Sequence, residues 1–344
     1  MIADQLRRLE DPRTLSPSDA RGLFEALLSP GTSELERVAL LLATSTRRES
    51  GAELALLARE MRKRARPFRI PTGDGAIDLC GSGGARLPSF NVSTVSAFVV
   101  AAAGLPVVKH GNRSSRGPCG SSDLLLALGL PVDRSVEFAR ASYRRYHLAF
   151  LHAPLFHPST RLVATARRAL GIPTVFNRLG PLSNPAGVRA QVVGVPTLPA
   201  TARAADALRR LGVRKGLAMS SREGCDEFSP KRPTDGVRWT ASGSRSITVR
   251  PERYLETDER AGDWGALPAP EAAEEAERVL AGGGGARRGS VLLTSGAALW
   301  VGGRAHSLAE GVGQAREALD GGAAETLLAS LRALSSRFPP EEGS

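Results

Sequence analysis

A glycine-dense turn, closely followed by small polar side chains, is the first part of this chain with the makings of a binding site. Gly81-Ser-Gly-Gly84 follows a short apolar run, and Asn91-Val-Ser-Thr94 lies where a helix should begin. Backbone N–H groups of such a turn and the positive end of a helix bind anionic oxygens. The turn lacks the Lys-Ser/Thr of a P-loop, and Arg86 replaces the last glycine of a dinucleotide fingerprint. Taken alone, a tight strand-to-helix turn needs glycine with or without a ligand.

Two neighbouring segments strengthen the phosphate interpretation. The polar residues of Asn91-Val-Ser-Thr94 can cap a helix or coordinate phosphate and Mg²⁺, and capping needs only one of them. Lys109-His-Gly-Asn-Arg113 places a cation, an imidazole and an amide on one short loop. A lone histidine is usually structural, but a run of polar residues and glycine at a strand end suits a site better than a core.

Strands and helices alternate around these motifs. Residues 1–67 show only helical signals, with capping patterns at Ser16–Asp19, Ser33–Glu36 and Ser50–Glu53. Beyond them we expect strands at 76–80, 105–109, 149–151, 191–195 and 216–219, helices at 93–103, 121–128, 161–170 and 201–211, a strand pair at 237–240 and 246–249, an acidic helix at 271–280, a glycine linker at 282–285 and two last helices. The predicted fold class is α/β, with a small all-helical lobe packed on a larger α/β domain that has a mainly parallel sheet. The glycine turn would then lie at the carboxyl end of the sheet, where open α/β folds bind ligands.

Composition limits the other possible functions. The net charge of +11 invites a nucleic-acid partner, but arginine is scattered along the chain and aromatic residues are only 5%. Nucleic acid is therefore an unlikely partner, left open by the charge. The longest apolar stretch, 95–108, is interrupted by Gly104 and Pro106 and is shorter than the ~20 residues of a membrane span. With three irregularly spaced cysteines, we expect a cytoplasmic protein in a reducing compartment.

From these motifs onward the chain resembles the anthranilate phosphoribosyltransferases, which have the type III nucleoside phosphorylase-like fold. The most specific match is Thr174-Val-Phe-Asn-Arg-Leu-Gly-Pro-Leu-Ser-Asn-Pro185. Other matching segments are the helical lead-in 38–67, the glycine turn, Asn91–Thr94, Lys109–Arg113, Gly120-Ser-Ser-Asp-Leu-Leu125, Phe150-Leu-His-Ala-Pro154 with His157, Arg167-Arg-Ala-Leu-Gly171, Asp226-Glu227 and Ser307-Leu-Ala-Glu-Gly311. The resemblance covers nearly the whole chain.

The resemblance implies a Mg²⁺-dependent glycosyltransferase of tryptophan biosynthesis. In this reaction the amino group of anthranilate displaces pyrophosphate from phosphoribosyl pyrophosphate. Attack at the anomeric carbon passes through an oxocarbenium-like state, so positioning and stabilisation of the leaving group suffice and no general base is assigned. The implied donor-binding residues are Gly81, Ser82, Gly84, Asn91, Ser93, Thr94, Lys109 and Ser121. The implied acceptor-binding residues are His110, Asn112, His157, Arg167 and Pro181, and the implied metal ligands are Ser93, Asp226 and Glu227.

Each implied role has a plainer structural alternative. Asp226-Glu227 alone would be an ordinary solvated pair, and Arg167 alone an ordinary surface arginine. An acceptor that carries a carboxylate nevertheless needs a cation, and a planar guanidinium supplies one.

The chain departs from the family pattern in two ligand loops and again before the late acidic helix, where Ala266-Leu-Pro-Ala-Pro270 replaces an expected glycine pair and asparagine. The family's Gly-Thr-Gly-Gly-Asp is here Gly81-Ser-Gly-Gly-Ala85, and its Ser-Ser-Lys-Ser-Gly is here Arg116-Gly-Pro-Cys-Gly120. These changes remove a carboxylate and hydroxyl groups near the donor. They leave two alternatives open: a divergent relative with another aromatic acceptor, and a non-catalytic nucleic-acid-binding paralogue.

The resemblance also implies how the chain is organised. We expect the helical lobe to span 1–67 and to be completed by about 161–185, while 68–160 and 186–344 form the α/β domain that binds the phosphoribosyl donor. The active site would lie in the cleft between them, and a homodimer would form through the helical lobe. Cys80, Cys119 and Cys225 each lie beside a ligand loop. Small residues suit tight loops; oxidation-sensitive activity is the other hypothesis.

Overall fold

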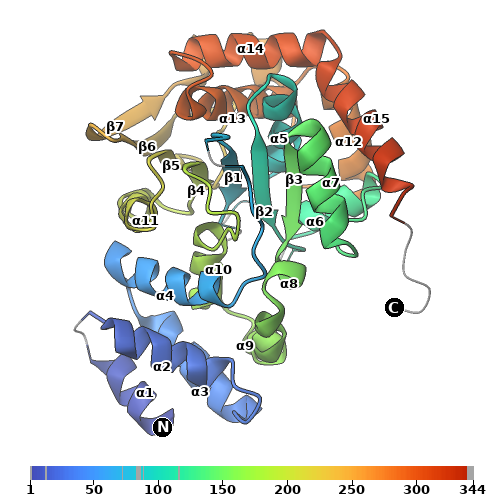
Figure 1. Cartoon of the computed structure of the whole chain (residues 1–344). Coiled ribbons are helices and arrows are strands. Elements are labelled where there is room, and N and C mark those ends of the chain that lie inside the picture. Colours follow the sequence, from blue (N-terminus) through green and yellow to red (C-terminus); the bar gives the residue numbers. More distant parts are fainter. Residues whose placement is uncertain are drawn as a thin grey trace.

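The computed structural model describes residues 2–338 except 12, 13, 72, 83–86, 88, 115 and 116. A seven-stranded sheet runs through the larger part, in the order β3-β2-β1-β4-β5-β6-β7 (Figure 1). The strands are β1 (Ile77–Gly81), β2 (Val107–Gly111), β3 (Leu148–His152), β4 (Ala190–Gly194), β5 (Lys215–Ser221), β6 (Thr234–Thr240) and β7 (Gly243–Val249). Strands β1 to β5 pair in parallel, and β6 and β7 add an antiparallel edge. The predicted α/β class with a mainly parallel sheet is confirmed.

The register of the parallel strands brings their carboxyl ends to one edge. Gly81 at the end of β1 pairs with Gly194 at the end of β4, and Gly111 at the end of β2 pairs with His152 at the end of β3. The loops that follow these strands therefore start side by side, although they are far apart in the sequence. This edge is where an open parallel sheet binds ligands.

Helices cover both faces of the sheet, and each face buries its own apolar cluster. On one face α5 packs against α13, and α13 packs against α14. On the other face α11 packs against β5 and α4. The helices of this larger part are α5 (Val92–Ala102), α6 (Ser121–Ala127), α7 (Val136–Tyr146), α11 (Leu198–Arg210), α12 (Ala269–Leu280), α13 (Ala286–Gly302), α14 (Leu308–Asp320) and α15 (Ala323–Ser335).

The sequence expectation was wrong at the C-terminal end. It placed two helices after the glycine linker, whereas the described chain has three there, α13, α14 and α15. Gly303 ends α13 with φ +87°, and Gly322 precedes α15 with φ +73°. Both glycines adopt the left-handed conformation that favours glycine and interrupts a helix.

Two other helices also differ from expectation. Helix α7 was not predicted, although the Oγ of Ser135 caps it by accepting a hydrogen bond from the backbone N–H of Phe138 at 3.0 Å. The helix expected at 161–170 starts as a 3₁₀ segment, Pro158–Val163, and becomes α-helical only in α9 (Ala164–Leu170).

The N-terminal part is helical, as predicted. It comprises α1 (Ile2–Glu10), α2 (Pro17–Leu27), α3 (Glu34–Thr46) and α4 (Gly51–Lys63). The three predicted capping patterns at Ser16, Ser33 and Ser50 are confirmed, because each serine accepts from the backbone N–H three residues on while the acidic side chain there accepts from the serine N–H.

A second group of short helices packs on this N-terminal part. These are α8 (Ala153–Phe156), α9, α10 (Val175–Leu179) and the 3₁₀ segment Gly180–Leu182. Helix α9 contacts α3, and α10 contacts α3 and α4. In Figure 1, α9 lies towards the lower end of the molecule and α10 lies above α4. Their apolar cluster continues without a break into sheet residues such as Val193 and Trp239. The division of the chain into two domains stays a prediction.

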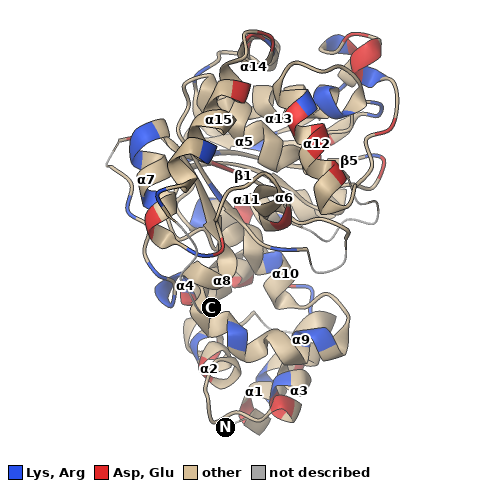
Figure 2. Ribbon diagram, turned by 90° about the vertical axis from the view of Figure 1, so that its right-hand side faces the viewer, with Lys and Arg blue, Asp and Glu red and all other residues tan. Residues whose placement is uncertain are grey.

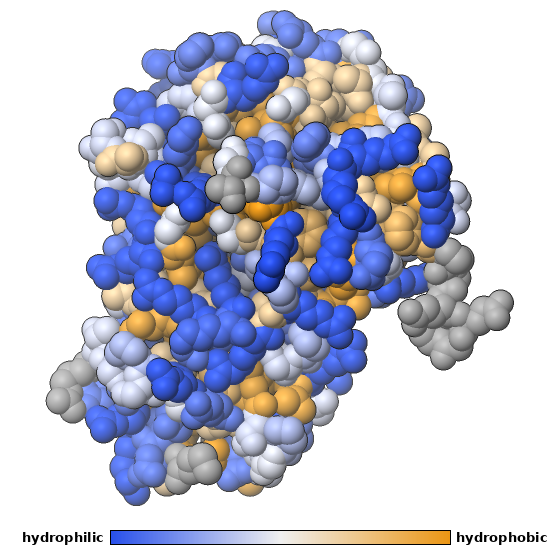
Figure 3. All heavy atoms as spheres, viewed as in Figure 1, coloured by the Kyte–Doolittle hydropathy of each residue, from blue (hydrophilic) through white to orange (hydrophobic). Residues whose placement is uncertain are grey.

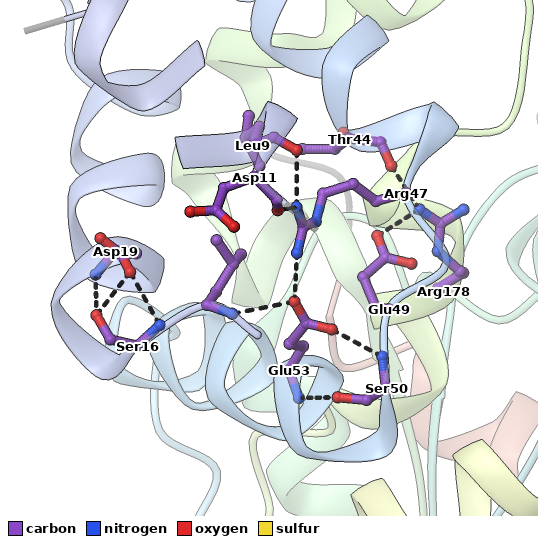
Figure 4. A network of polar contacts seen from close by, with 11 residues as sticks. Leu9, Asp11, Ser16, Asp19, Thr44, Arg47, Glu49, Ser50, Glu53 and Arg178 are labelled. Carbon is purple, nitrogen blue, oxygen red and sulfur yellow. Dashed lines mark hydrogen bonds and ion pairs between the residues drawn. The ribbon is translucent and has the colours of Figure 1, made fainter. Parts of the chain in front are cut away.

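A buried ion pair organises the N-terminal helices (Figure 4). Arg47 donates to Glu53 at 2.6 Å and to the backbone oxygens of Leu9 and Asp11, and Glu53 also accepts from the N–H of Leu15. In the same view, Arg178 of α10 donates to the carboxylate of Glu49 at 2.6 Å and so ties α10 to the loop before α4.

A helix that spans a membrane must be both long and apolar. Among the residues described, none of the helices combines the length and apolar character needed to cross a bilayer. Figure 3 shows one face that is mostly hydrophilic, with apolar atoms exposed in patches between polar ones.

We predict that Glu53→Gln lowers the free energy of unfolding by about 3 kcal/mol, because removing one charge of a buried pair leaves the other uncompensated. The matched control is Glu36→Gln, which alters the same capping-box position of α3 on an exposed side chain and should cost much less. Urea denaturation followed by circular dichroism measures both, and equal losses would contradict the importance of the buried pair.

Candidate active site

Most of the residues predicted to bind the donor lie together at the carboxyl edge of the sheet. Gly81 ends β1 and Ser82 follows it, Lys109 lies in β2, and Asp226 follows β5. Gly84 and Ala85 of the glycine turn, and Arg116 of the other divergent loop, lie outside the described residues.

Glycines let the loop after β5 approach the ends of β1 and β4. A Cβ on Gly194 would lie 1.7 Å from the backbone oxygen of Asp226, and one on Gly81 would lie 2.9 Å from its Oδ2. The Oγ of Ser82 donates a hydrogen bond to Oδ2 of Asp226 at 3.0 Å. The carboxylate of Asp226 is therefore fixed beside the glycine turn because no side chain keeps the two segments apart.

Lys109 lies at the centre of this cluster. Its ammonium group is buried and donates to the backbone oxygen of Leu79 at 2.5 Å and to the Oγ of Ser93 at 3.1 Å. The N–H of Ser93, in the first turn of α5, donates to Oε1 of Glu227 at 3.3 Å. A lysine has three N–H donors, so one more is available for an incoming ligand.

The adjacent carboxylates fit magnesium better than zinc. Burial, and then the charge of Asp226, raise the pKa of Glu227 to about 8, so a cation that binds there offsets an existing repulsion. In the described ranges no group of three or more His, Cys, Asp or Glu side chains is placed to hold a metal. Mg²⁺ is commonly held by one or two carboxylates together with substrate phosphates. Asp226, Glu227 and the hydroxyl of Ser93 suit that arrangement.

Asn91 does not cap α5, although the sequence left that role open. Its side chain makes no capping hydrogen bond, and its Nδ2 donates instead to the backbone oxygen of Cys119 at 3.2 Å. Thr94 is buried in the first turn of the same helix. Asn91 therefore connects the start of α5 to the loop that precedes α6.

Ser121 lies at the start of α6 and holds the loop after β2. Its Oγ donates to the backbone oxygen of Asn112 and accepts from the N–H of Asn112, both at 3.0 Å. A Cβ on Gly111 would lie 2.2 Å from this Oγ, so the contact requires glycine. The side chain of Asn112 is left exposed at the edge of the site.

Two predicted acceptor-binding residues, His110 and His157, pack against each other with ring centroids 5.1 Å apart. Nδ1 of His110 lies 3.2 Å from the oxygen of Gly180, and Nε2 of His157 lies 3.1 Å from the oxygen of Ser183. A carbonyl only accepts, so these nitrogens carry the protons. Burial lowers the pKa of His110 to about 3 and that of His157 to about 4, which keeps both rings neutral.

Arg167 lies farther along the chain, in the last turn of α9. Its guanidinium stacks 5.4 Å from the ring centroid of Phe176, and burial lowers its pKa. Within the described part of the chain no carboxylate forms an ion pair with it. The remaining predicted residue, Pro181, is buried, and its oxygen accepts from Nε2 of Gln191 at 2.7 Å.

Sequence analysis missed the buried groups beneath these residues. Asp78 is fully buried, accepts from the N–H of His110 at 3.2 Å and from Nδ2 of Asn184 at 2.9 Å, and has its pKa raised to about 6 by burial. Arg62 of α4 donates to the oxygen of Leu182 at 2.8 Å. An aspartate inside the otherwise apolar run Ile-Asp-Leu-Cys was the available signal for Asp78.

The three cysteines are poor candidates for reactive thiols. Burial raises the pKa of Cys80 well above its ordinary value and the pKa of Cys119 and Cys225 to about 11. A high pKa disfavours the thiolate that reacts with oxidants. The arrangement favours the structural explanation for these residues over the redox hypothesis.

Comparison with known proteins gives full-length matches. Residues 73–325 match the family described as glycosyl transferase family, a/b domain. The anthranilate phosphoribosyltransferase of Syntrophobacter fumaroxidans is 37% identical over 336 residues, which cover 96% of this chain and 98% of that protein. Anthranilate phosphoribosyltransferase 2 of Streptomyces coelicolor is 39% identical over 316 residues, with coverage of 92% and 94%.

Solved structures agree with these matches. The crystal structure of anthranilate phosphoribosyltransferase from Thermus thermophilus has a TM-score of 0.87 at 36% identity and covers 97% of this chain and 99% of its own. The Saccharomyces cerevisiae enzyme in complex with PRPP and Mg has a TM-score of 0.85 at 23% identity, with 98% of each chain covered, and shares the fold.

We predict that His157→Gln reduces the acid sensitivity of folding. The pKa of His157 is depressed in the folded state to about 4, so between its ordinary value of about 6.5 and that value the unfolded chain binds the proton preferentially and stability falls as the pH falls. Glutamine keeps a donor for Ser183 but cannot titrate. From about pH 7.5 to about pH 5 the variant should lose about 2 kcal/mol less than the wild type in urea denaturation. Identical losses would refute the assignment.

Proposed function

This chain belongs to the anthranilate phosphoribosyltransferase family, and on that premise we propose that it transfers the phosphoribosyl group of phosphoribosyl pyrophosphate to the amino group of anthranilate, with release of pyrophosphate. The observation that carries the proposal is the buried contact of Lys109 with Ser93, whose N–H binds Glu227 at the carboxyl edge of the sheet. This contact joins a cation, a helix start and a carboxylate pair in one place.

The donor is proposed to bind along this edge. The open N–H of Lys109 and the amide end of α5 favour the pyrophosphate oxygens, because both present positive charge in a buried setting. Asp226, Glu227 and Ser93 would hold Mg²⁺, which supplies charge neutralisation of the leaving pyrophosphate when bound. Gly81, Ser82, Gly84, Asn91, Thr94 and Ser121 complete the proposed donor set.

The acceptor is proposed to bind beside the two histidines. Arg167 offers its guanidinium to the carboxylate of anthranilate, Pro181 contributes an apolar wall, and Asn112 aims the amine together with His110 and His157. Because both histidine rings are neutral, neither carries an extra proton that it could give to the attacking amino group. Arg167 favours an aromatic acid over an uncharged base, although it also fits aromatic acids other than anthranilate.

The protein contributes to the reaction by positioning the two substrates and by stabilising the charge of the leaving group. The C–N bond forms at the anomeric carbon as the C–O bond to pyrophosphate breaks, and no side chain need take part covalently. Water would hydrolyse the donor, so closure of the N-terminal helices over the edge would protect it.

The nucleic-acid alternative finds no support in the distribution of charge. In Figure 2 the Lys and Arg segments are separated by Asp and Glu or uncharged segments and form no continuous stripe on this face. A polyanion partner needs such a stripe.

We also propose a homodimer through the N-terminal helices. Leu35 and Leu42 of α3 are 78% and 47% exposed, and Ile172, just after α9, is 43% exposed. Helices α3 and α9 contact each other, so these side chains belong to neighbouring elements. Sedimentation velocity measures the oligomeric state, and a monomer mass at micromolar concentration would contradict the proposed homodimer.

The test of the proposed function follows anthranilate fluorescence in the presence of phosphoribosyl pyrophosphate and Mg²⁺. We expect turnover by the wild type, and Arg167→Ala should raise KM for anthranilate by about 30-fold, since the lost charged hydrogen bonds are worth about 2 kcal/mol. The control is Arg168→Ala, which removes the next, exposed arginine, bonded only to Oγ1 of Thr165 among the described residues. Absence of turnover despite donor binding would mean that the protein uses another acceptor. Absence of donor binding would mean that the protein is a relative that no longer catalyses the reaction.

A further inference from the structure

The turn at residues 180–183 is held in an unusual way, because four successive backbone oxygens each accept a hydrogen bond from a different buried or partly buried side chain. Gly180 is bound by His110, Pro181 by Gln191, Leu182 by Arg62 and Ser183 by His157. These four donors come from β2, β4, α4 and the segment after α8. The turn is therefore a meeting point for elements that are distant in the sequence.

Arg62 differs from the other three donors. Within the described residues it is the only one of the four that carries a fixed charge and the only one contributed by an N-terminal helix. Its Nε lies 2.8 Å from the oxygen of Leu182, while its Nη2 is buried and has no hydrogen-bond partner in the described part of the chain. Burial lowers its pKa to about 10, against the attraction of Asp78.

This arrangement is not that of a stabilising salt bridge. None of the carboxylates in the described ranges lies within ion-pair distance of Arg62, and the carboxylate whose charge acts on it, Asp78, is occupied by the N–H of His110 and by Asn184. A buried cation with an unused donor costs folding free energy. Its presence at the turn is explained if the turn must be placed accurately relative to α4.

We propose that Arg62 is a positioning residue for the acceptor, acting through the turn that it anchors. The turn contains Pro181, and its oxygens orient the rings of His110 and His157, which are three of the five residues proposed to bind the acceptor. Arg62 thereby links the placement of α4 to the shape of the acceptor site, and it does not itself touch the donor. This inference rests on the proposed function for its kinetic part only.

The experiment compares Arg62→Met with Arg59→Met. Arg59 lies on the same helix and also donates to a backbone oxygen, that of Arg210 at 2.6 Å, but at the end of α11 and away from the turn. Each variant therefore removes one guanidinium-to-carbonyl hydrogen bond from α4, although Arg59 is exposed and Arg62 is partly buried.

Two readouts are measured on the full chain. In hydrogen exchange followed by mass spectrometry, amides of the peptide around 178–186 should exchange at least about fivefold faster in Arg62→Met than in the wild type. In Arg59→Met their exchange rate should equal that of the wild type. In steady-state kinetics, Arg62→Met should raise KM for anthranilate at least about tenfold while KM for phosphoribosyl pyrophosphate stays within about twofold.

Every outcome decides for or against the proposal. Unchanged exchange of the turn, or an equal rise of both KM values, overturns it. If Arg62→Met does not fold, Arg62→Lys serves, because it keeps the charge but not the planar donor fork, and the same selective rise of acceptor KM is expected at about threefold or more. If the wild type does not use anthranilate, the proposed function fails, and the exchange measurement still tests whether Arg62 holds the turn.

Discussion

The buried ammonium group of Lys109 is the charge on which the site depends. It contacts the oxygen of Leu79 in β1 and the hydroxyl of Ser93 in α5, and so holds the end of β2 against two neighbouring elements. Burial raises the pKa of Asp78 and of Glu227, and the charge of Lys109 opposes both shifts. A cation in a low-dielectric position acts strongly on every group around it. The charge of Lys109 therefore acts both on the donor side of the site and on the buried groups beneath the acceptor side.

Close approach of backbone segments is the second requirement, and glycine meets it. Gly194 and Gly81 admit the loop of Asp226, and Gly111 admits the hydroxyl of Ser121. The loop of Asp226 is distant in the sequence from both glycines that it meets, whereas Ser121 begins α6 soon after β2. The parallel register sets the strand ends level, and the absence of a Cβ lets the loops close over them. The fold thus gathers its polar groups at one edge without a continuous motif in the sequence.

Sequence reasoning succeeded where the determinants are local. Capping at Ser50 and the strands of the sheet follow from patterns within a few residues, whereas the roles of Lys109 and its neighbours follow from the resemblance of several separate motifs to the family. It failed where the determinants are distant: Arg62 bonds to Leu182, and Asp78 to Asn184, across more than a hundred residues. Helix boundaries set by left-handed glycines were also missed, because the residue type alone does not distinguish a glycine inside a helix from a glycine that ends it.

The central claim is that the carboxylate pair after β5 and the cluster around Lys109 together form a metal-assisted donor site, even though the glycine turn ends in Ala85 instead of the family's aspartate. Calorimetric titration of phosphoribosyl pyrophosphate with and without Mg²⁺, on the wild type and on Asp226→Asn, tests it directly. The account predicts that Mg²⁺ strengthens donor binding by about tenfold or more, as expected when carboxylates and phosphates share the ion, and that Asp226→Asn removes most of this gain. Equal donor affinity with and without Mg²⁺ in the wild type would contradict it.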